Sequence, residues 1–150
     1  MEAVTAALMI DDESSLDLAE ALAGEPAVGE ILLVSSPISG GVEPNRLSGA
    51  ARAKSRTLDI TGFPGAGINR VLDETRSRYL LIVLPGERIG PGQRAIERMV
   101  SVATDSGAGL VYSDFRDDLG GEIKDHPLID YQSGSLRDSF DFGSMILISR

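Results

Sequence analysis

Short apolar runs recur along the chain, and polar turns or segments with helical spacing separate them. The run at residues 79–84 is unbroken, and its lack of alternation is typical of a strand that is covered on both faces of a sheet. Pro85 and Gly86 end this run, because proline cannot donate to a strand ladder and glycine permits a tight turn. Further strands are predicted at residues 4–10, 31–34, 56–60, 110–113 and 144–149.

Helices are predicted between these strands, where apolar residues recur at the i, i+3, i+4, i+7 spacing of one helical face. The first helix can be capped by Ser14 or Ser15 and ends at Gly24, whereas Pro91 can begin the last one. The apolar faces consist of Leu16, Ala19, Leu22 and Ala23, of Ile68, Val71, Leu72 and Thr75, and of Ile96, Met99, Val100 and Ala103. The alternation of strands and helices predicts an α/β sandwich with a mostly parallel central sheet.

Two long segments lack a clear period. Residues 37–55 are rich in Gly, Pro, Ser and Asn, which predicts a mobile loop. Residues 114–142 hold acidic residues, glycines and the sole histidine, which predicts a surface excursion rather than a second domain. Residues 1–150 are therefore interpreted as a single domain. Because the apolar strand at 144–149 has nothing after it, we expect this domain to be the N-terminal part of a longer protein.

Composition excludes several classes of function. With 150 residues, 42% of them apolar, the chain can bury one core. Its net charge is −9 and Lys and Arg form no block, so a nucleic-acid backbone is not expected as a partner. Without cysteine and with His126 as the single histidine, it has neither a disulfide framework nor a thiolate or histidine metal cluster. The first apolar run breaks at Asp11, too early for a signal peptide or a membrane span, which predicts a cytoplasmic protein.

Acidic residues follow two of the predicted strands. Asp11, Asp12 and Glu13 come directly after the first strand, and Glu87 follows the strand at 79–84. In open α/β sheets the carboxyl ends of the strands are where ligands bind. Carboxylates there can accept hydrogen bonds from a ribose or a nucleobase, or hold a divalent cation. A solvated turn that places negative charge at the start of a helix is the alternative interpretation.

The opening segment ALMIDDESSLDLAEAL resembles the start of a response-regulator receiver domain, in which paired acids bind Mg²⁺ beside a phosphorylated aspartate. The resemblance covers only this segment. No predicted strand ends in an aspartate at the distance that the family requires, and the family's late lysine at a strand end is missing. A degenerate receiver domain is therefore kept as a minor alternative.

A second set of segments occurs in a fixed order along nearly the whole chain. Asn69, Tyr79 and the strand end at Leu84 are spaced as in the pattern N-x-G-x-x-x-A-x-G-E-Y-I-x-F-L-D-x-D, and LPGERIGP follows as D-x-D-D-x-x-x-P would. EILLVSS, GLVYSDF and FGSMILISR match further strands of the same family in order. Together they resemble the nucleotide-sugar half of family 2 glycosyltransferases. This resemblance implies a GT-A type, Rossmann-like α/β/α sandwich that binds a nucleotide-diphosphate sugar for inverting transfer to an acceptor hydroxyl.

The same resemblance assigns roles to individual residues. The residues implied to bind the nucleotide are Asp11, Asp12, Glu13, Ser35, Ser36 and Asn69. Leu84, Pro85 and Gly86 replace the D-x-D that holds Mn²⁺ or Mg²⁺ in the family. Glu87 is then the carboxylate of this segment that could bind such a cation. No catalytic residue is expected before residue 150, because the family's catalytic aspartate lies beyond the matched segment, so these residues alone should be inactive.

The lost D-x-D also favours a different class of protein, a non-catalytic binding or scaffold domain on the same fold. Nucleotide binding that depends on a divalent cation would distinguish it from a transferase. The sequence does not specify the sugar, the base or the acceptor. Residues 131–143 mix aromatic residues with Arg137, Asp138 and Asp141, which suits an acceptor pocket, a packed lid or a contact in a homo-oligomer.

Overall fold

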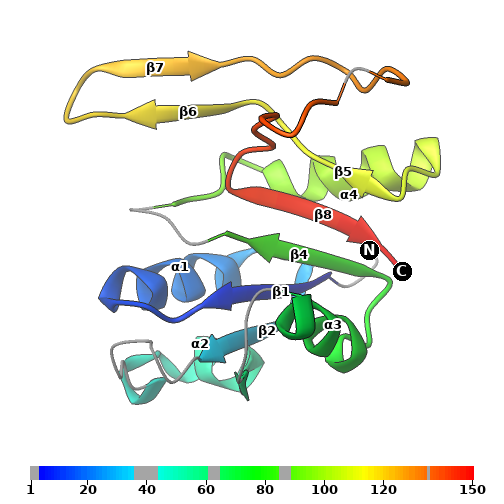
Figure 1. The fold of residues 1–150 in the computed structure, drawn as a ribbon. Coiled ribbons are helices and arrows are strands. Elements are labelled where there is room, and N and C mark those ends of the chain that lie inside the picture. Colours follow the sequence, from blue (N-terminus) through cyan, green and yellow to red (C-terminus); the bar gives the residue numbers. More distant parts are fainter. Residues whose placement is uncertain (1–3, 36–43, 61–64, 85–88, 135) are drawn as a thin grey trace.

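A computed structural model of the chain describes residues 4–35, 44–60, 65–84, 89–134 and 136–150. These residues form an α/β sandwich with a six-stranded sheet and a separate two-stranded sheet (Figure 1). The elements in chain order are β1 (Val4–Met9), α1 (Glu13–Gly24), β2 (Val28–Ser35), the 3-10 helix η1 (Pro44–Arg46), α2 (Gly49–Lys54), β3 (Ser55–Asp59), α3 (Gly65–Glu74), β4 (Tyr79–Val83), α4 (Ala95–Ser106), β5 (Leu110–Val111), β6 (Phe115–Asp118), β7 (Ile123–His126) and β8 (Met145–Ser149).

The large sheet has the strand order β3-β2-β1-β4-β8-β5. Strands β1 to β4 are parallel, whereas β8 runs antiparallel to both of its neighbours. The prediction of a mostly parallel α/β sheet is confirmed, and the architecture is compatible with a Rossmann-like fold. The antiparallel direction of β8 follows from its connection, because the chain returns from β5 without a crossover helix.

Helices cover both faces of the sheet, so the unbroken apolar runs of the central strands are buried on both sides. On one face, α1, α2 and α4 share a core with residues such as Leu33 and Leu81. On the other face, Val71 of α3 forms a cluster with Leu32 and Leu80. In Figure 1, α3 lies in front of the sheet and α4 lies behind it. Neighbouring strand residues such as Leu32 and Leu33 belong to opposite clusters, because successive side chains of a strand point to opposite faces of the sheet.

The connection after β3 determines where a ligand can bind. From β1 the chain moves outward through β2 to β3, and it then returns through α3 to β4 on the other side of β1. The chain leaves the carboxyl end of β1 through α1 toward β2, and it leaves the carboxyl end of β4 through α4 toward β5 on the opposite side. The strand order therefore reverses between β1 and β4, and a crevice opens at this point in open α/β sheets.

All three predicted helices differ in detail from the structure. Helix α1 is capped by Asp12 rather than by Ser14 or Ser15. Helix α4 begins at Ala95 rather than at Pro91, because the backbone N–H of Ala95 bonds the carbonyl of Gly92 (3.0 Å) in a preceding turn. Ile68, predicted on the buried face of its helix, is 42% exposed. Contact between α3 and the sheet begins one turn later, at Val71.

The predicted loop at residues 37–55 contains the helical elements η1 and α2 and the first residue of β3, so that prediction is wrong for residues 44–46 and 49–55. Residues 37–43 lie outside the described part of the chain. The side-chain oxygen of Ser48 caps α2 by accepting from the N–H of Ala51, and Ala51 is fully buried. Lys54 fixes the other end by donating to the carbonyls of Ala23 (2.8 Å) and Val28 (2.9 Å).

Part of the predicted surface excursion, residues 115–126, is a β-hairpin, a regular element that the sequence pattern did not indicate. Strands β6 and β7 pair antiparallel across Gly120 and Gly121, whose φ angles are 76° and 110°. Glycine adopts positive φ without a steric cost, which allows the two-residue turn. On the hairpin, the ring of His126 stacks on Phe115 with 4.5 Å between centroids, and its Nε2 lies 2.9 Å from Oδ2 of Asp117.

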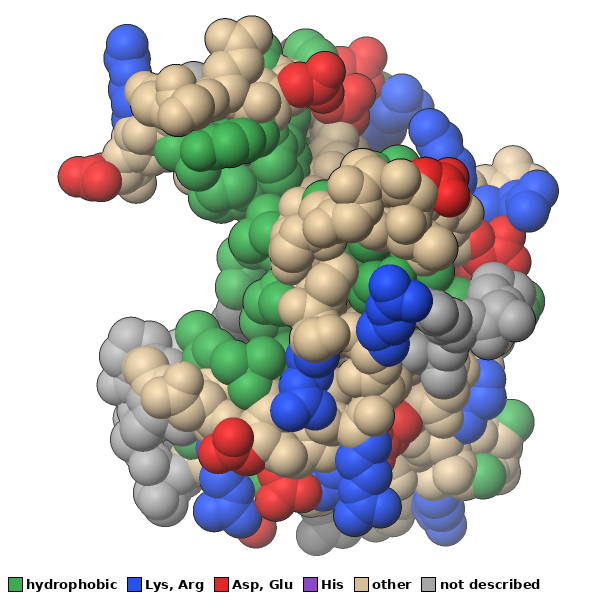
Figure 2. All heavy atoms as spheres, turned by 90° about the vertical axis from the view of Figure 1, so that its right-hand side faces the viewer, with side chains coloured by type: hydrophobic (Ala, Val, Ile, Leu, Met, Phe, Trp, Pro, Cys, Tyr) green, Lys and Arg blue, Asp and Glu red, His purple; other side chains and the backbone are tan. Residues whose placement is uncertain are grey.

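The hairpin projects from the top of the molecule in Figure 1. Figure 2 shows the side that lies at the right of Figure 1, where a notch lined by hydrophobic side chains separates the projecting upper part from the body. The two-stranded sheet is therefore set apart from the main core. Within the described residues, no helix combines the length and the apolar character needed to cross a bilayer.

Candidate functional site

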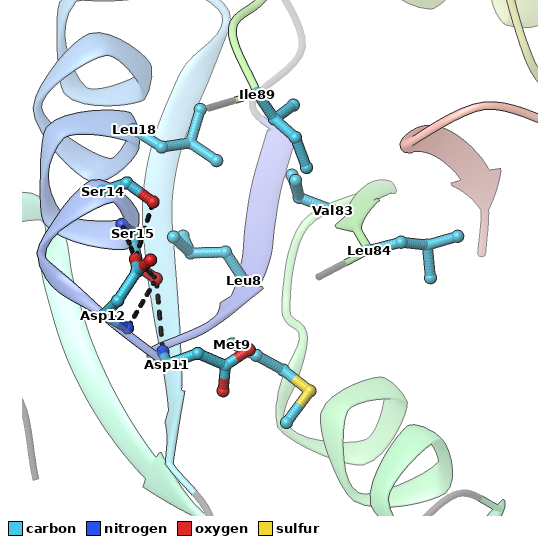
Figure 3. A pocket seen from close by; sticks show the side chains of 10 residues that line it. All are labelled: Leu8, Met9, Asp11, Asp12, Ser14, Ser15, Leu18, Val83, Leu84 and Ile89. Atoms are coloured by element: carbon cyan, nitrogen blue, oxygen red, sulfur yellow. Dashed lines mark hydrogen bonds between the residues drawn. The ribbon is translucent and has the colours of Figure 1, made fainter. Parts of the chain in front are cut away.

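A cavity of about 330 Å³ lies at the carboxyl ends of β1 and β4 (Figure 3). Its position coincides with the reversal of strand order, where ligands bind in open α/β sheets. Its volume is at the lower end of the range of small-molecule sites. The lining residues are Leu8, Met9, Asp11, Asp12, Ser14, Ser15, Leu18, Val83, Leu84 and Ile89.

One side of the cavity is apolar. Leu8 and Val83 come from the two neighbouring strands, Leu18 comes from α1, and Ile89 comes from the segment before α4. Figure 3 shows these side chains converging on the same space. Such a wall can contact a flat or aliphatic part of a ligand, and it excludes water from hydrogen bonds made beside it.

The polar side is the turn between β1 and α1. Asp12 is the N-cap of α1, and its Oδ1 accepts from the backbone N–H of Ser15 (3.1 Å) and from Oγ of Ser14 (2.6 Å). The hydrogen bond from the Ser14 hydroxyl, followed by that from the Ser15 backbone, lowers the pKa of the Asp12 carboxyl below its usual value. Oγ of Ser15 accepts in return from the backbone N–H of Asp12 (3.5 Å), and it also accepts from the N–H of Asp11 (3.2 Å). This turn is a capping box, and it holds Asp12 in a structural role.

The side chain of Asp11 lies differently from that of Asp12. In Figure 3 it extends away from the Ser14 and Ser15 network and lies beside Met9. Asp11 is exposed, so a ligand in the cavity can reach it. Both charged residues in the lining, Asp11 and Asp12, are acidic. The cavity therefore suits hydroxyl or N–H donors better than a phosphate.

The sequence also predicted nucleotide contacts elsewhere. Glu13 is exposed and forms an ion pair with Arg46 of η1, and Ser35 donates its hydroxyl to Oδ1 of Asp59 on β3. Asn69 is exposed on α3. None of Glu13, Ser35 and Asn69 is among the described residues that line the cavity. Ser36 and Glu87 lie outside the described residues. Of the predicted set, Asp11 and Asp12 come together in the cavity.

The position of the expected metal ligands is occupied by an apolar residue. Leu84 directly follows β4, lines the cavity and is 42% exposed. Pro85 and Gly86 lie outside the described part of the chain. Among the described residues, no group of three or more Asp, Glu, His or Cys lies close enough to hold a metal ion.

No protein-family model matches the chain, and a search of curated proteins found no match for it. The inference of function therefore depends on the cavity and its chemistry. The resemblance of short segments to family 2 glycosyltransferases adds an expectation about the ligand.

The apolar wall was not predicted from the sequence. Leu8, Leu18 and Val83 have the spacing of ordinary core residues, and each also belongs to the main core. Ile89 follows the turn after β4 and packs against the same core. The pattern of apolar residues does not distinguish a side chain that fills the core from one that borders a cavity, so no sequence signal identifies this wall.

Proposed function

We propose that this domain binds the nucleoside part of a nucleotide-diphosphate sugar, as the donor-binding half of a family 2 type glycosyltransferase with a GT-A sandwich. One observation carries the proposal: a cavity with an apolar wall and an acidic rim lies where the strand order reverses between β1 and β4. The order of the matched segments along the sequence supports the choice of a nucleotide sugar over other ligands.

The chemistry of the cavity suits a nucleoside better than a phosphate. A base would lie against Leu8, Leu18 and Val83, while the carboxylate of Asp11 would accept from a ribose hydroxyl or a base N–H. The first turn of α1 does not suit an anion. Asp12 already caps it and Glu13 adds a negative charge, and the turn from β1 has none of the glycines of a phosphate-binding loop. We therefore expect the diphosphate to point out of the cavity.

In the proposed enzyme, the sugar passes to an acceptor hydroxyl with inversion at the anomeric carbon. A general base removes the hydroxyl proton as the nucleoside diphosphate leaves. In the family this base is an aspartate beyond the segments matched here. Residues 1–150 are therefore proposed to bind the donor without transferring the sugar.

A second candidate is a non-catalytic binding domain on the same fold. It is favoured by Leu84, which stands where the family places a metal ligand and lines the cavity. A receiver domain is not proposed, because β1 lies between β2 and β4 here, whereas receiver domains have the strand order 2-1-3-4-5.

The test is calorimetric titration of the chain with UDP, GDP and their sugar conjugates, each with and without Mn²⁺. We expect one base to bind, and Asp11→Asn to weaken binding about tenfold because a charged acceptor is lost. Asp17→Asn is the matched control, since Asp17 is an exposed carboxylate on helix α1 and does not line the cavity.

The outcomes separate the two candidates. Binding that Mn²⁺ strengthens supports the transferase, whereas equal binding without metal supports the non-catalytic domain. Absence of binding at millimolar nucleotide, or equal affinity in wild type and Asp11→Asn, would contradict the proposed site.

A further inference from the structure

A second hollow of about 470 Å³ lies in the segment between β7 and β8. It is lined by Ile129, Gly134, Arg137, Ser139 and Phe140, and it shares no residue with the first cavity. The proposed nucleotide site makes no use of it.

Tyr112, directly after β5, fixes two walls of this hollow. Its ring meets Phe140 edge-on, with 5.6 Å between centroids, and its hydroxyl donates to the carbonyl of Ile129 (2.7 Å). Phe142 completes the aromatic cluster at 5.3 Å from Tyr112 and 4.7 Å from Phe140. Edge-to-face aromatic pairs are favourable beyond the area that they bury. The hollow is thus held by side chains packed against the end of the main sheet.

A short turn places the positively charged side chain of Arg137 at the hollow. The backbone N–H of Phe140 bonds the carbonyl of Arg137 (2.9 Å), and this turn carries both Arg137 and Ser139. Both side chains are exposed. Within the described part of the chain, the guanidinium of Arg137 and the hydroxyl of Ser139 make no hydrogen bond or ion pair. Their donors are available to a ligand.

The composition of the hollow defines the ligand. Arginine is a permanent cation whose planar fork matches a carboxylate. One cation neutralises one negative charge, and the chain as a whole carries −9, which favours a monoanion over a doubly charged phosphate. Ile129, which is 61% exposed, and the half-buried Phe140 offer apolar surface beside the cation.

We propose that this hollow binds a small ligand with a carboxylate on a flat apolar body. The carboxylate pairs with Arg137 and accepts from Ser139, and the apolar body lies against Ile129 and Phe140. This site is independent of the nucleotide proposal, because the two cavities have no residue in common.

The test is an NMR titration of the ¹⁵N-labelled chain with benzoate at constant ionic strength, with benzamide as the neutral analogue. We expect saturable shifts at the amides of Ile129, Gly134 and Phe140 with benzoate, and at least about tenfold weaker binding of benzamide. Arg137→Gln should weaken benzoate binding to a similar extent. Arg98→Gln is the control, because Arg98 is also exposed but lies on α4 outside the hollow.

Arg137 is exposed, so its substitution should leave the remaining amide spectrum unchanged, which separates loss of binding from loss of folding. Arg137→Lys keeps the charge but not the fork, and it should bind benzoate with intermediate affinity. The proposal is overturned if benzoate causes no saturable shift at these amides, if benzamide binds equally well, or if Arg137→Gln binds benzoate like the wild type.

Discussion

Asp11 and Asp12 are neighbours of the same residue type, yet their side chains have different environments. Asp12 accepts from Ser14 and from the backbone of Ser15, and these hydrogen bonds hold the start of α1. Asp11 extends beside Met9, away from that network (Figure 3). The carboxylate of Asp11 is therefore the one that a ligand would meet, whereas the carboxylate of Asp12 determines where the helix begins.

Substitution of Asp12 tests this structural role. The pKa of Asp12 is lowered in the folded chain, chiefly by Ser14 and then by Ser15, so its ionised form stabilises the fold above the unfolded-state pKa. This stabilisation is lost as the pH falls through the folded-state pKa. Asp12→Asn should lower the urea midpoint at pH 7, and the difference from wild type should shrink below the ordinary pKa of 3.8.

Urea titrations followed by circular dichroism at several pH values measure this difference. Asp17→Asn is the control, because Asp17 is exposed on the same helix outside the cap. A midpoint difference for Asp12→Asn that stays constant from neutral to acidic pH would show that the carboxylate charge does not stabilise the cap.

At the residue scale, the sequence predicted the acidic residues of the candidate site but not its apolar wall. An acidic turn after an apolar run identified Asp11 and Asp12, because strand ends in α/β sheets are recognisable from the pattern. Separate roles for the two residues depend on which one the serine hydroxyls reach, and that is a matter of backbone geometry. The sequence indicated Arg137 only as part of a segment that mixes aromatic and charged residues. The hollow beside it was not predicted, because the contacts of Tyr112 that fix this turn join residues far apart in the chain.

Among the elements, the hairpin of β6 and β7 lies close to the start of β8, because the ring of Phe115 packs beside Gly143. A Cβ atom at Gly143 would lie 2.9 Å from Cδ1 of Phe115, closer than such contacts occur. Gly143 has a φ of 74°, a conformation that favours glycine. The packing of Phe115 at the base of the hairpin therefore requires glycine at position 143.

Gly143→Ala should destabilise the protein by about 1–3 kcal/mol, from backbone strain together with the clash against Phe115. Gly107→Ala separates the two causes, because Gly107 has a similar φ of 70° but a Cβ atom added there would meet no described neighbour within 4 Å. Urea denaturation of both variants measures the loss. Equal destabilisation would mean that the contact with Phe115 adds nothing.

Most elements were predictable because burial on one or both faces leaves a period in the sequence. Helix α2 was missed because Gly49–Lys54 is too short to show a period. The hairpin was missed because its strands, FRDD and IKDH, are largely exposed and carry no apolar alternation. The Gly120-Gly121 pair was the one available turn signal. The antiparallel direction of β8 leaves no trace, since a buried strand has the same composition in either direction.

At the scale of the whole molecule, stability should be distributed unevenly. Strand β1 is hydrogen-bonded on both edges, to β2 and β4, and is covered on both faces. Each strand of the hairpin pairs only with the other one in the described sheets, and most of its residues are exposed. A two-stranded ribbon has little stability of its own. Local opening of the hairpin should therefore precede global unfolding.

Native-state hydrogen exchange tests this expectation. Amides of β1 should exchange only through global unfolding, and paired amides of β6 and β7 should exchange about a hundredfold faster or more. Strand β3, at the edge of the large sheet, should be intermediate. Protection of the hairpin equal to that of β1 would show that the two sheets unfold as one unit.

The place of β8 between β4 and β5 has a consequence for synthesis on the ribosome. The four parallel strands can pair as soon as β4 has emerged, but β5 joins the described sheet only through β8, which is made much later. Until then the outer edge of β4 remains open, and an open edge can pair with other chains. The nascent protein should therefore need chaperones most while residues 84–144 are being made.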